Sequence, residues 1–269
     1  MSRRRRRNSG TGGQIAAIAI LAVVLVTVLA CIFWFWIRAN DAFVAIDEET
    51  LCPKQGIAAQ TIVLLDTTDA LSRVTQSEVL NRLNDLTASL PRGGYLDIRV
   101  LNENPDLTAS ILSLCNPGAG GDIDPLIGNP ELAGKRWAER FAGPVAEALA
   151  ASVSGGAQNF SPILAALQQI AAERLSTKEQ QAVETRIVVV SDMLEHTGYY
   201  SHFRDGRSIA TYRDIAGSRY LTDLHGAEID FWMVMRDRPD IDVTELAEFW
   251  LQWADMSKGR GHVVRLMGM

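Results

Sequence analysis

The distribution of apolar and polar residues along the chain predicts strands that alternate with helices. Runs at 62–65, 186–190 and 229–235, apolar apart from Arg186 and Asp230, are typical of strands covered on both faces. Further strands are predicted at 95–101, 107–114 and 262–266, and helices at 75–90, 131–152, 162–175 and 243–258. The residues from Thr75 to Glu78 (TQSE) predict a capping box at the start of the first of these helices. This alternation predicts a doubly wound α/β domain with a mainly parallel sheet flanked by helices.

Ahead of this domain, residues 15–37 form one apolar stretch of 23 residues without a charge. At about 1.5 Å per residue, a helix of this length crosses a hydrocarbon core of about 30 Å. Phe33 to Trp36 gather at one end, where aromatic rings favour the membrane–water interface. A cleaved signal peptide would have a shorter apolar region, so we expect an uncleaved transmembrane helix.

Charge sets the expected orientation of this helix. Arg3 to Arg7 precede it, and no acidic residue occurs before Asp41. By the positive-inside rule, the N-terminus lies in the cytoplasm and the rest of the chain is periplasmic or extracellular. The expected organisation is a basic cytoplasmic tail, a single span of the cytoplasmic (inner) membrane, a linker and one α/β domain, at residues 1–14, 15–37, 38–57 and 58–269.

The exported part is acidic. The whole chain has 26 Lys and Arg against 32 Asp and Glu; without the five N-terminal arginines 21 basic residues remain, for a net charge of −11. This balance argues against a nucleic-acid partner, whose phosphates need a basic face.

Two cysteines, Cys52 and Cys115, fall in the exported part, whereas Cys31 lies in the apolar stretch. An even pair in an oxidising compartment favours a disulfide, and two separate buried thiols are the alternative.

Polar side chains follow two of the apolar strands. Asp66, Thr67, Thr68 and Asp69 come after the first, and Asp192 after the run at 186–190. In parallel sheets, ligands bind beyond the carboxyl ends of the strands, where both groups are expected. The oxygens at 66–69 can order a turn and cap the next helix, or they can hold a hard cation.

At these positions the chain resembles a von Willebrand factor type A (VWA) domain, over roughly residues 58–269. In that family the first strand ends in an Asp-x-Ser-x-Ser loop, a threonine opens a later helix, and an aspartate ends the fourth strand. Asp66 and Thr68 match the first two loop positions, but Ala70 stands in place of the second serine. Ser161 resembles the threonine, and Asp192 matches the last aspartate.

The resemblance implies a degenerate metal-ion-dependent adhesion site. Its expected ligands are Asp66, Thr68, Ser161 and Asp192, with Asp69 or Ser72 as substitutes for the oxygen missing at Ala70. It implies Mg²⁺ or Mn²⁺ with an open position for an acidic side chain of a protein partner. It also implies an antiparallel strand after the second one, which would bring Cys115 to the same edge as Cys52.

Residues 196–226 are rich in histidine, tyrosine and arginine, types that are enriched in binding surfaces. The candidate surface residues are His196, Tyr199, Tyr200, His202 and Arg204. An exposed loop and a solvated helix of ordinary composition are the alternative.

Three functions compete. The preferred one is a membrane-anchored interaction module without enzymatic activity, with a divalent cation as a candidate bridge to its protein partner. A structural subunit of an envelope complex with a dead metal site is the second. A Mg²⁺-dependent hydrolase is disfavoured, because haloacid-dehalogenase phosphatases need a second aspartate two residues after the first, and position 68 is a threonine.

Overall fold

The computed structural model describes residues 11–42, 45–68, 71–101, 108–121, 123, 125, 128–152, 160–236 and 239–266. The chain divides into two compact units, the first ending at Ala45 and the second beginning at Ile46. Each unit is described by itself.

The first unit contains the helix α1 (Thr11–Ala42). Its segment Ile15–Ile37 is long and apolar enough to cross a membrane, and its apolar side chains are exposed. The Thr27 hydroxyl donates a hydrogen bond to the Val23 carbonyl at 2.9 Å, so this polar group has a partner within the helix. By length and composition, such a helix is either a membrane span or a signal sequence.

The second unit is built on a six-stranded sheet in the order β3-β2-β1-β4-β5-β6. The strands are β1 (Ala59–Leu65), β2 (Tyr95–Leu101), β3 (Thr108–Cys115), β4 (Glu184–Ser191), β5 (Glu228–Val234) and β6 (Arg260–Leu266). Neighbouring strands are parallel except for β3, which pairs antiparallel with β2 at one edge. The predicted α/β fold with a mainly parallel sheet is confirmed, including the antiparallel strand.

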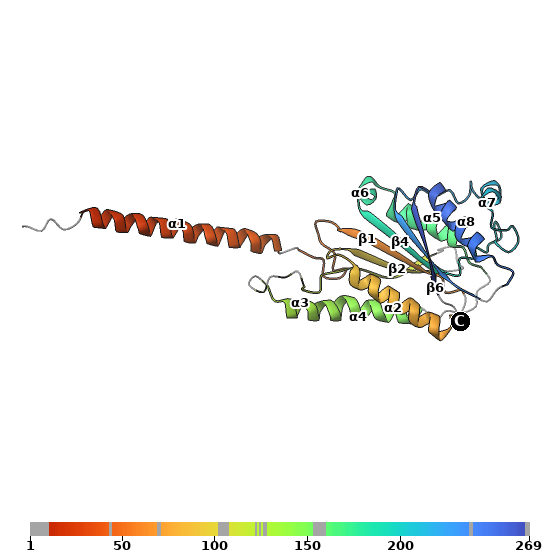
Figure 1. Ribbon diagram of the computed structural model, residues 1–269, viewed down its shortest axis with the longest axis horizontal. Coiled ribbons are helices and arrows are strands. Elements are labelled where there is room, and N and C mark those ends of the chain that lie inside the picture. The colour runs from red at the N-terminus through yellow and green to blue at the C-terminus, as the bar shows by residue number, and fades with distance from the viewer. Residues whose placement is uncertain are drawn as a thin grey trace, which may run out of the picture. The chain divides into compact units, whose positions relative to one another are not determined.

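Helices cover both faces of the sheet, as Figure 1 shows. On one face lie α2 (Arg73–Ser89) and α4 (Gly143–Ser152); α4 continues α3 (Pro130–Trp137) through a π-helical turn (Ala138–Ala142). On the other face lie α5 (Ile163–Arg174) and α8 (Val243–Met256). The short helices α6 (Lys178–Gln181) and α7 (Ile209–Ile215) complete the unit.

Alternation along the central strands divides the core in two. On β1, Ile62 and Leu64 pack with α5 and α8, while Val63 and Leu65 pack with α2 and α4. These side chains are almost wholly buried. The alternation therefore also decides which face receives the residue that follows Leu65.

The segment 46–57, predicted to belong to the linker, is part of the second unit. Leu51 is buried in the core beside α2, and the Thr50 carbonyl accepts a hydrogen bond from the Cys115 amide at 2.8 Å. Cys52 and Cys115 form a disulfide, with their Cα atoms 4.7 Å apart. The expected pairing is therefore present, and it joins this segment to the end of β3.

Helix α2 begins earlier than its sequence suggested. The motif from Thr75 to Glu78 predicted a capping box, but the N-cap residue is Ser72, whose hydroxyl accepts a hydrogen bond from the Thr75 amide at 3.2 Å. Thr75 itself is buried inside the first turn. The prediction is wrong because Ser72 is also a good N-cap residue and lies three positions closer to the strand.

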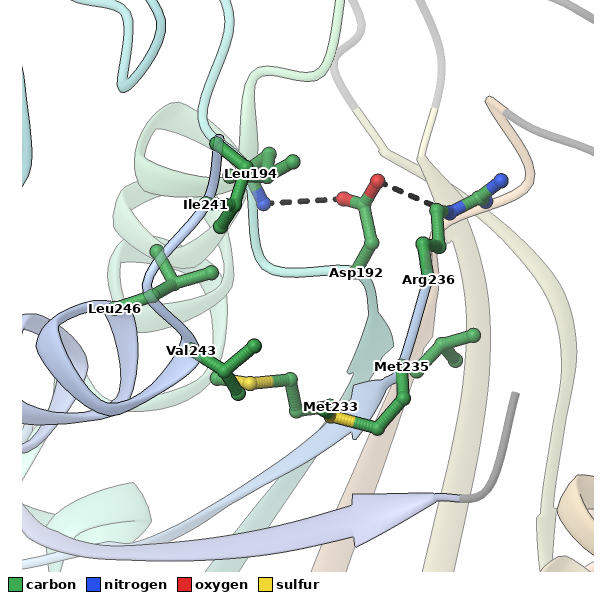
Figure 2. Close-up of a pocket in the computed structure, with 9 residues that line it drawn as sticks. Asp192, Leu194, Met233, Met235, Arg236, Ile241, Val243 and Leu246 are labelled. Carbon is green, nitrogen blue, oxygen red and sulfur yellow. Dashed lines mark hydrogen bonds and ion pairs between the residues drawn. The ribbon is translucent and has the colours of Figure 1, made fainter. Parts of the chain in front are cut away.

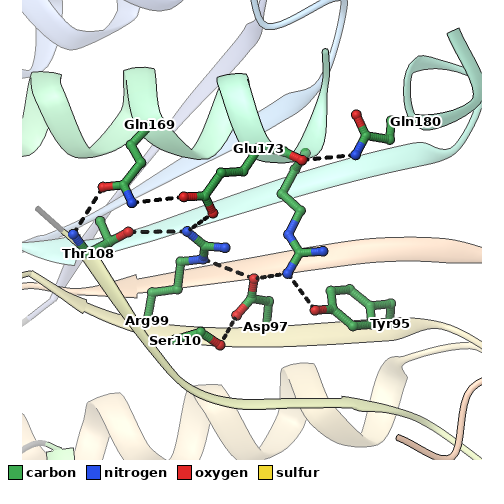
Figure 3. A network of polar contacts seen from close by, with 9 residues as sticks. Tyr95, Asp97, Arg99, Thr108, Ser110, Gln169, Glu173 and Gln180 are labelled. Atoms are coloured by element: carbon green, nitrogen blue, oxygen red, sulfur yellow. Dashed lines mark hydrogen bonds and ion pairs between the residues drawn. The ribbon is translucent and has the colours of Figure 1, made fainter. Parts of the chain in front are cut away.

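A buried polar network attaches α5 to the edge of the sheet (Figure 3). Asp97 on β2 accepts hydrogen bonds from Arg99 and Arg174, each at 2.9 Å, and from Ser110 at 2.7 Å. Arg99 also pairs with Glu173 on α5 at 2.6 Å. These contacts fix the C-terminal end of α5 against β2.

A candidate binding site at the carboxyl edge of the sheet

The centre of the candidate site is Asp66, the first residue after β1. Its amide donates to the Val190 carbonyl on β4 at 2.9 Å, so its position is fixed by the sheet. Because Leu65 faces α2, Asp66 continues the alternation toward α5. Ser191 does the same at the end of β4, following Ile187 and Val189. The two side chains therefore lie side by side on one face.

Both carboxylate oxygens of Asp66 are occupied by protein donors. Oδ1 accepts from the Thr68 amide at 3.0 Å and from the Thr68 hydroxyl at 2.6 Å. Oδ2 accepts from the Ser161 hydroxyl at 2.9 Å and from the Ser191 hydroxyl at 2.7 Å. A carboxylate has about four lone-pair positions, and four hydrogen bonds fill them. We call Asp66, Thr68, Ser161 and Ser191 the Asp66 cluster.

Two loops and the end of β4 provide the hydroxyls of this cluster. Thr68 is in the turn that follows β1, which Asp66 itself orders. Ser161 lies just before α5 and forms a two-way backbone bridge with His196, both bonds being 3.0 Å long. Thr68, Ser161 and Ser191 are all buried. The structure therefore brings together three of the four ligands suggested by the sequence, and adds Ser191, which is not part of the family pattern.

Asp192 turns to a different partner. Its Oδ1 accepts from the Leu194 amide at 3.1 Å, and its Oδ2 lies 3.2 Å from Nε of Arg236, beyond the end of β5 (Figure 2). The next residue, Met193, has a backbone φ of 65°, in the left-handed region that residues other than glycine rarely adopt. The Ser191 hydroxyl and the Trp250 indole hold Met193 in place through hydrogen bonds of 2.8 Å to its amide and carbonyl.

The hollow beside this ion pair is small. Besides Asp192 and Arg236, its walls are apolar side chains from the segment after β4, from the end of β5 and from the start of α8 (Figure 2). It encloses about 20 Å³. Such a volume holds roughly one water molecule, far less than a drug-sized ligand requires. A larger hollow of about 230 Å³ lies at the opposite edge of the sheet, at the start of β4 and β5. The Asp66 cluster therefore does not line a substrate-sized cavity in either of these places.

Behind the cluster, Glu195 is fully buried. One carboxyl oxygen accepts from the Leu164 amide at 2.9 Å, at the N-terminus of α5, and the other has no hydrogen-bond partner among the residues that the structure describes. Burial raises the pKa of Glu195 well above its ordinary value, against the opposing effect of the α5 amides. The Glu195 amide donates to Nδ1 of His202 at 3.1 Å, and burial lowers the pKa of His202 to about 3. His202 is therefore a neutral core residue.

The other candidate residues lie in different surroundings. Ser72 caps α2, and Asp69 lies outside the described residues. Of the five residues proposed for a binding surface, Tyr200 and His202 are buried among aromatic rings including Phe249, so they cannot form a surface contact. The composition did not reveal this, because tyrosine and histidine occur both in cores and on surfaces.

An exposed aromatic group does lie next to Ser161. Phe160 is 48% exposed and stacks on His196, which in turn meets the edge of Phe203, 45% exposed. Tyr199 is 58% exposed, and the Arg219 guanidinium lies 3.5 Å from the centre of its ring. Arg204, another proposed surface residue, is exposed and pairs with Asp205 at 2.7 Å. Of these proposed surface residues, Tyr199 and Arg204 are thus exposed and His196 is half-buried.

The Asp66 cluster has the chemistry of a hard-cation site in part. Hydroxyls that donate their protons to Asp66 keep oxygen lone pairs, and hard cations take oxygen ligands. A second carboxylate is missing from the cluster because Asp192 is engaged by Arg236. In the described part of the chain, no three His, Cys, Asp or Glu side chains gather as a metal site. The donor set is therefore one carboxylate and three hydroxyls.

No protein-family model matches the chain, and no curated protein sequence matches it either. Two solved structures are similar over most of the chain. A von Willebrand factor type A protein from Catenulispora acidiphila has 12% sequence identity and a TM-score of 0.41, covering 78% of this chain and 39% of that one. The ArnB paralog VWA2 from Sulfolobus acidocaldarius has 9% identity and a TM-score of 0.40, covering 77% and 41%. This chain thus spans about two fifths of the length of each.

Proposed function

We propose that this chain is a membrane-anchored, non-enzymatic interaction module. Its α/β domain, on the extracytoplasmic side, binds a protein partner at the edge of the sheet that carries the Asp66 cluster. The observation that carries the proposal is the convergence of the Thr68, Ser161 and Ser191 hydroxyls on Asp66. The exposed rings of Phe160, Tyr199 and Phe203 beside this cluster supply the kind of contact area that protein interfaces use.

In this proposal a hard cation, Mg²⁺ or Mn²⁺, binds at the cluster and accepts an acidic side chain of the partner. Thr68, Ser161 and Ser191 would hold the cation through their hydroxyl oxygens, and Asp66 would orient them and supply negative charge. The cation supplies the positive charge that the partner's carboxylate needs. The role is binding and not turnover, and it agrees with the VWA resemblance of the sequence.

The cation is tested by thermal unfolding of the full-length chain in lipid nanodiscs. We expect Mg²⁺ or Mn²⁺ to raise the unfolding midpoint of the wild type and not that of Asp66→Asn. Asp85→Asn removes an exposed carboxylate on α2 and should respond like the wild type. No response of the wild type at about 10 mM cation, above the millimolar Kd of weak extracellular sites, would overturn this step.

A second candidate function is a structural subunit that binds its partner without a cation. Two observations favour it: the four hydrogen bonds that fill the lone pairs of Asp66, and the ion pair between Asp192 and Arg236. Chelation separates the two functions once a partner is purified. The complex of a cation-dependent module dissociates in EDTA, and that of a structural subunit persists.

The anchor is tested separately. We expect the mature chain to retain residues 1–37 and to resist extraction from membranes by alkaline carbonate, as an uncleaved span does. An intact mass that begins after residue 37, together with release into the soluble fraction, would identify a cleaved signal sequence instead.

A further inference from the structure

We propose that Arg236 sets the cation affinity of the Asp66 cluster by holding Asp192 in an ion pair that a bound cation must weaken. This inference rests on the proposed cation-assisted function. It assigns a specific regulatory contact to residues that the sequence pattern had not connected, since Arg236 belongs to no motif in the chain.

Asp192 is next in the chain to a member of the Asp66 cluster. It follows Ser191 directly, and consecutive Cα atoms lie about 3.8 Å apart. The Ser191 hydroxyl donates to Asp66 at 2.7 Å, so Asp192 is the acidic residue adjacent in the chain to a member of the cluster. It is therefore the natural source of a second carboxylate for a divalent cation, which one carboxylate alone leaves half neutralised.

An ion pair with Arg236 holds the Asp192 side chain toward the end of β5. Strands β4 and β5 pair with Ser191 opposite Met233, and Arg236 follows three residues later. Its Nε lies 3.2 Å from Oδ2 of Asp192. Figure 2 marks this ion pair with a dashed line. The Asp192 side chain is 11% exposed and that of Arg236 is 25% exposed, so the pair is largely shielded from solvent. A pair in such a place is screened much less than one on the open surface.

The charge balance sets the size of the effect. Asp66 and Asp192 together carry two negative charges, and Arg236 cancels one of them. A positive charge within several ångströms of a divalent cation lowers its affinity by well over tenfold at an effective dielectric constant of about 20. Partial exposure of Arg236 reduces this penalty through screening. Removal of the guanidinium charge should therefore tighten cation binding by about tenfold.

The experiment measures Mn²⁺ binding to the full-length chain in nanodiscs by electron paramagnetic resonance of free Mn²⁺, with the thermal midpoint as a second readout. We expect Arg236→Gln to bind Mn²⁺ about tenfold more tightly than the wild type. Unfolding without Mn²⁺ shows whether each variant is folded.

A matched control is available on the same two strands. Arg186 on β4 pairs with Asp230 on β5 at 2.6 Å, five residues before Ser191 and thus about 17 Å along the strand. Arg186→Gln removes the same charge from the same kind of pair, and should leave Mn²⁺ affinity unchanged. An equal gain in this control would show a general charge effect and overturn the inference.

Asp192→Asn completes the test. In the double variant with Arg236→Gln, the gain should disappear, because the released carboxylate is no longer there. A gain that persists without the Asp192 carboxylate overturns the inference. If the wild type binds Mn²⁺ and Arg236→Gln binds no more tightly, the inference fails while the cation-assisted function stands. If neither protein binds Mn²⁺, both fail.

Discussion

Glu195 and His202 lie behind the Asp66 cluster, and burial favours the neutral form of both side chains. The pKa of His202 is lowered to about 3, against about 6.5 in an unfolded chain. Its contribution to stability is therefore present above about pH 6.5 and is lost as pH falls toward the folded pKa. The pKa of Glu195 is raised by burial, so its contribution is present below about pH 4.3 and is lost as pH rises through the folded pKa.

Replacement of Glu195 by glutamine separates the two effects. The variant keeps an oxygen for the Leu164 amide but cannot ionise. Relative to the wild type, we expect it to gain stability as pH rises from about 5 to about 8, by up to 1.4 kcal/mol per pH unit until the folded pKa is passed. Urea unfolding of both proteins, followed by tryptophan fluorescence, gives this difference. Since His202 is present in both, its contribution cancels.

The prediction for Glu195 is contradicted if the substitution leaves the pH dependence of stability unchanged. Two stability curves that run parallel from about pH 5 to about pH 8 would mean that Glu195 has the same pKa in the folded and unfolded chain. In that case the carboxyl group would be ionised in its buried position, and its role as a neutral residue at the start of α5 would have to be abandoned.

Single residues also show what the sequence could and could not provide. The family pattern pointed to Asp66, Thr68 and Ser161, which do converge. Ser191 was missed although its position was readable, because strand alternation places it beside Asp66 on the α5 face. The ion pair of Asp192 was not readable, since it depends on the left-handed turn at Met193 and on the distant Arg236. Contacts of that kind arise only after the chain has folded.

At the scale of elements, apolar periodicity was sufficient to predict the strands and most of the helices. Fully buried strands such as β1 and β4 carry a strong signal, because both of their faces must be apolar. Helix ends were predicted less well, as α2 shows, because neighbouring Ser and Thr residues compete as caps. Strand β2, which lies between the edge strand β3 and the central β1, carries a weaker signal: it presents Asp97 and Arg99 to α5, and only tertiary structure gives these charges their partners.

The attachment of α5 to β2 can be tested through Asp97→Asn. The substitution keeps the shape of the side chain but removes the charge that Arg99 and Arg174 share. Because Arg99 is buried, we expect a loss of about 3 kcal/mol in the free energy of unfolding. Chemical denaturation of the full-length chain measures it.

The control for this prediction is Glu78→Gln, which breaks the exposed pair of Glu78 with Arg82 on α2. An exposed i,i+4 pair contributes only about 0.3–0.5 kcal/mol, so this variant should unfold nearly like the wild type. Equal losses for the two variants would show that the network of Asp97 has no special weight in holding α5.

For the whole molecule, the apolar helix could be predicted from the sequence, whereas the inclusion of residues 46–57 in the α/β domain could not. Length and the absence of charge mark residues 15–37 as a candidate span, because a bilayer sets a fixed thickness. The predicted domain, residues 58–269, does not include the segment 46–57, which has no strand or helix periodicity but lies in the second compact unit. That segment is held by Leu51 in the core and by the disulfide, and neither contact follows from local sequence.

The disulfide between Cys52 and Cys115 closes a loop of 63 residues between this segment and the edge strand β3. In the chain-entropy model, such a crosslink stabilises the folded state by about 4 kcal/mol, because it restricts the unfolded chain. We therefore expect Cys52→Ser combined with Cys115→Ser to lower the free energy of unfolding by this order. Cys31→Ser, in the apolar helix, should leave it unchanged.

Hydrogen exchange shows whether the crosslink acts on the whole domain or on one segment. If its effect is mainly on the unfolded chain, protection should fall together across β1, β4 and β5 in the double variant, by the same free energy that denaturation reports. The Cys115 amide, which donates to the Thr50 carbonyl, is the most sensitive local probe. Faster exchange confined to this amide and residues 46–57, with an unchanged free energy of unfolding, would mean that the disulfide only attaches a peripheral segment. The entropic account would then be wrong for this domain.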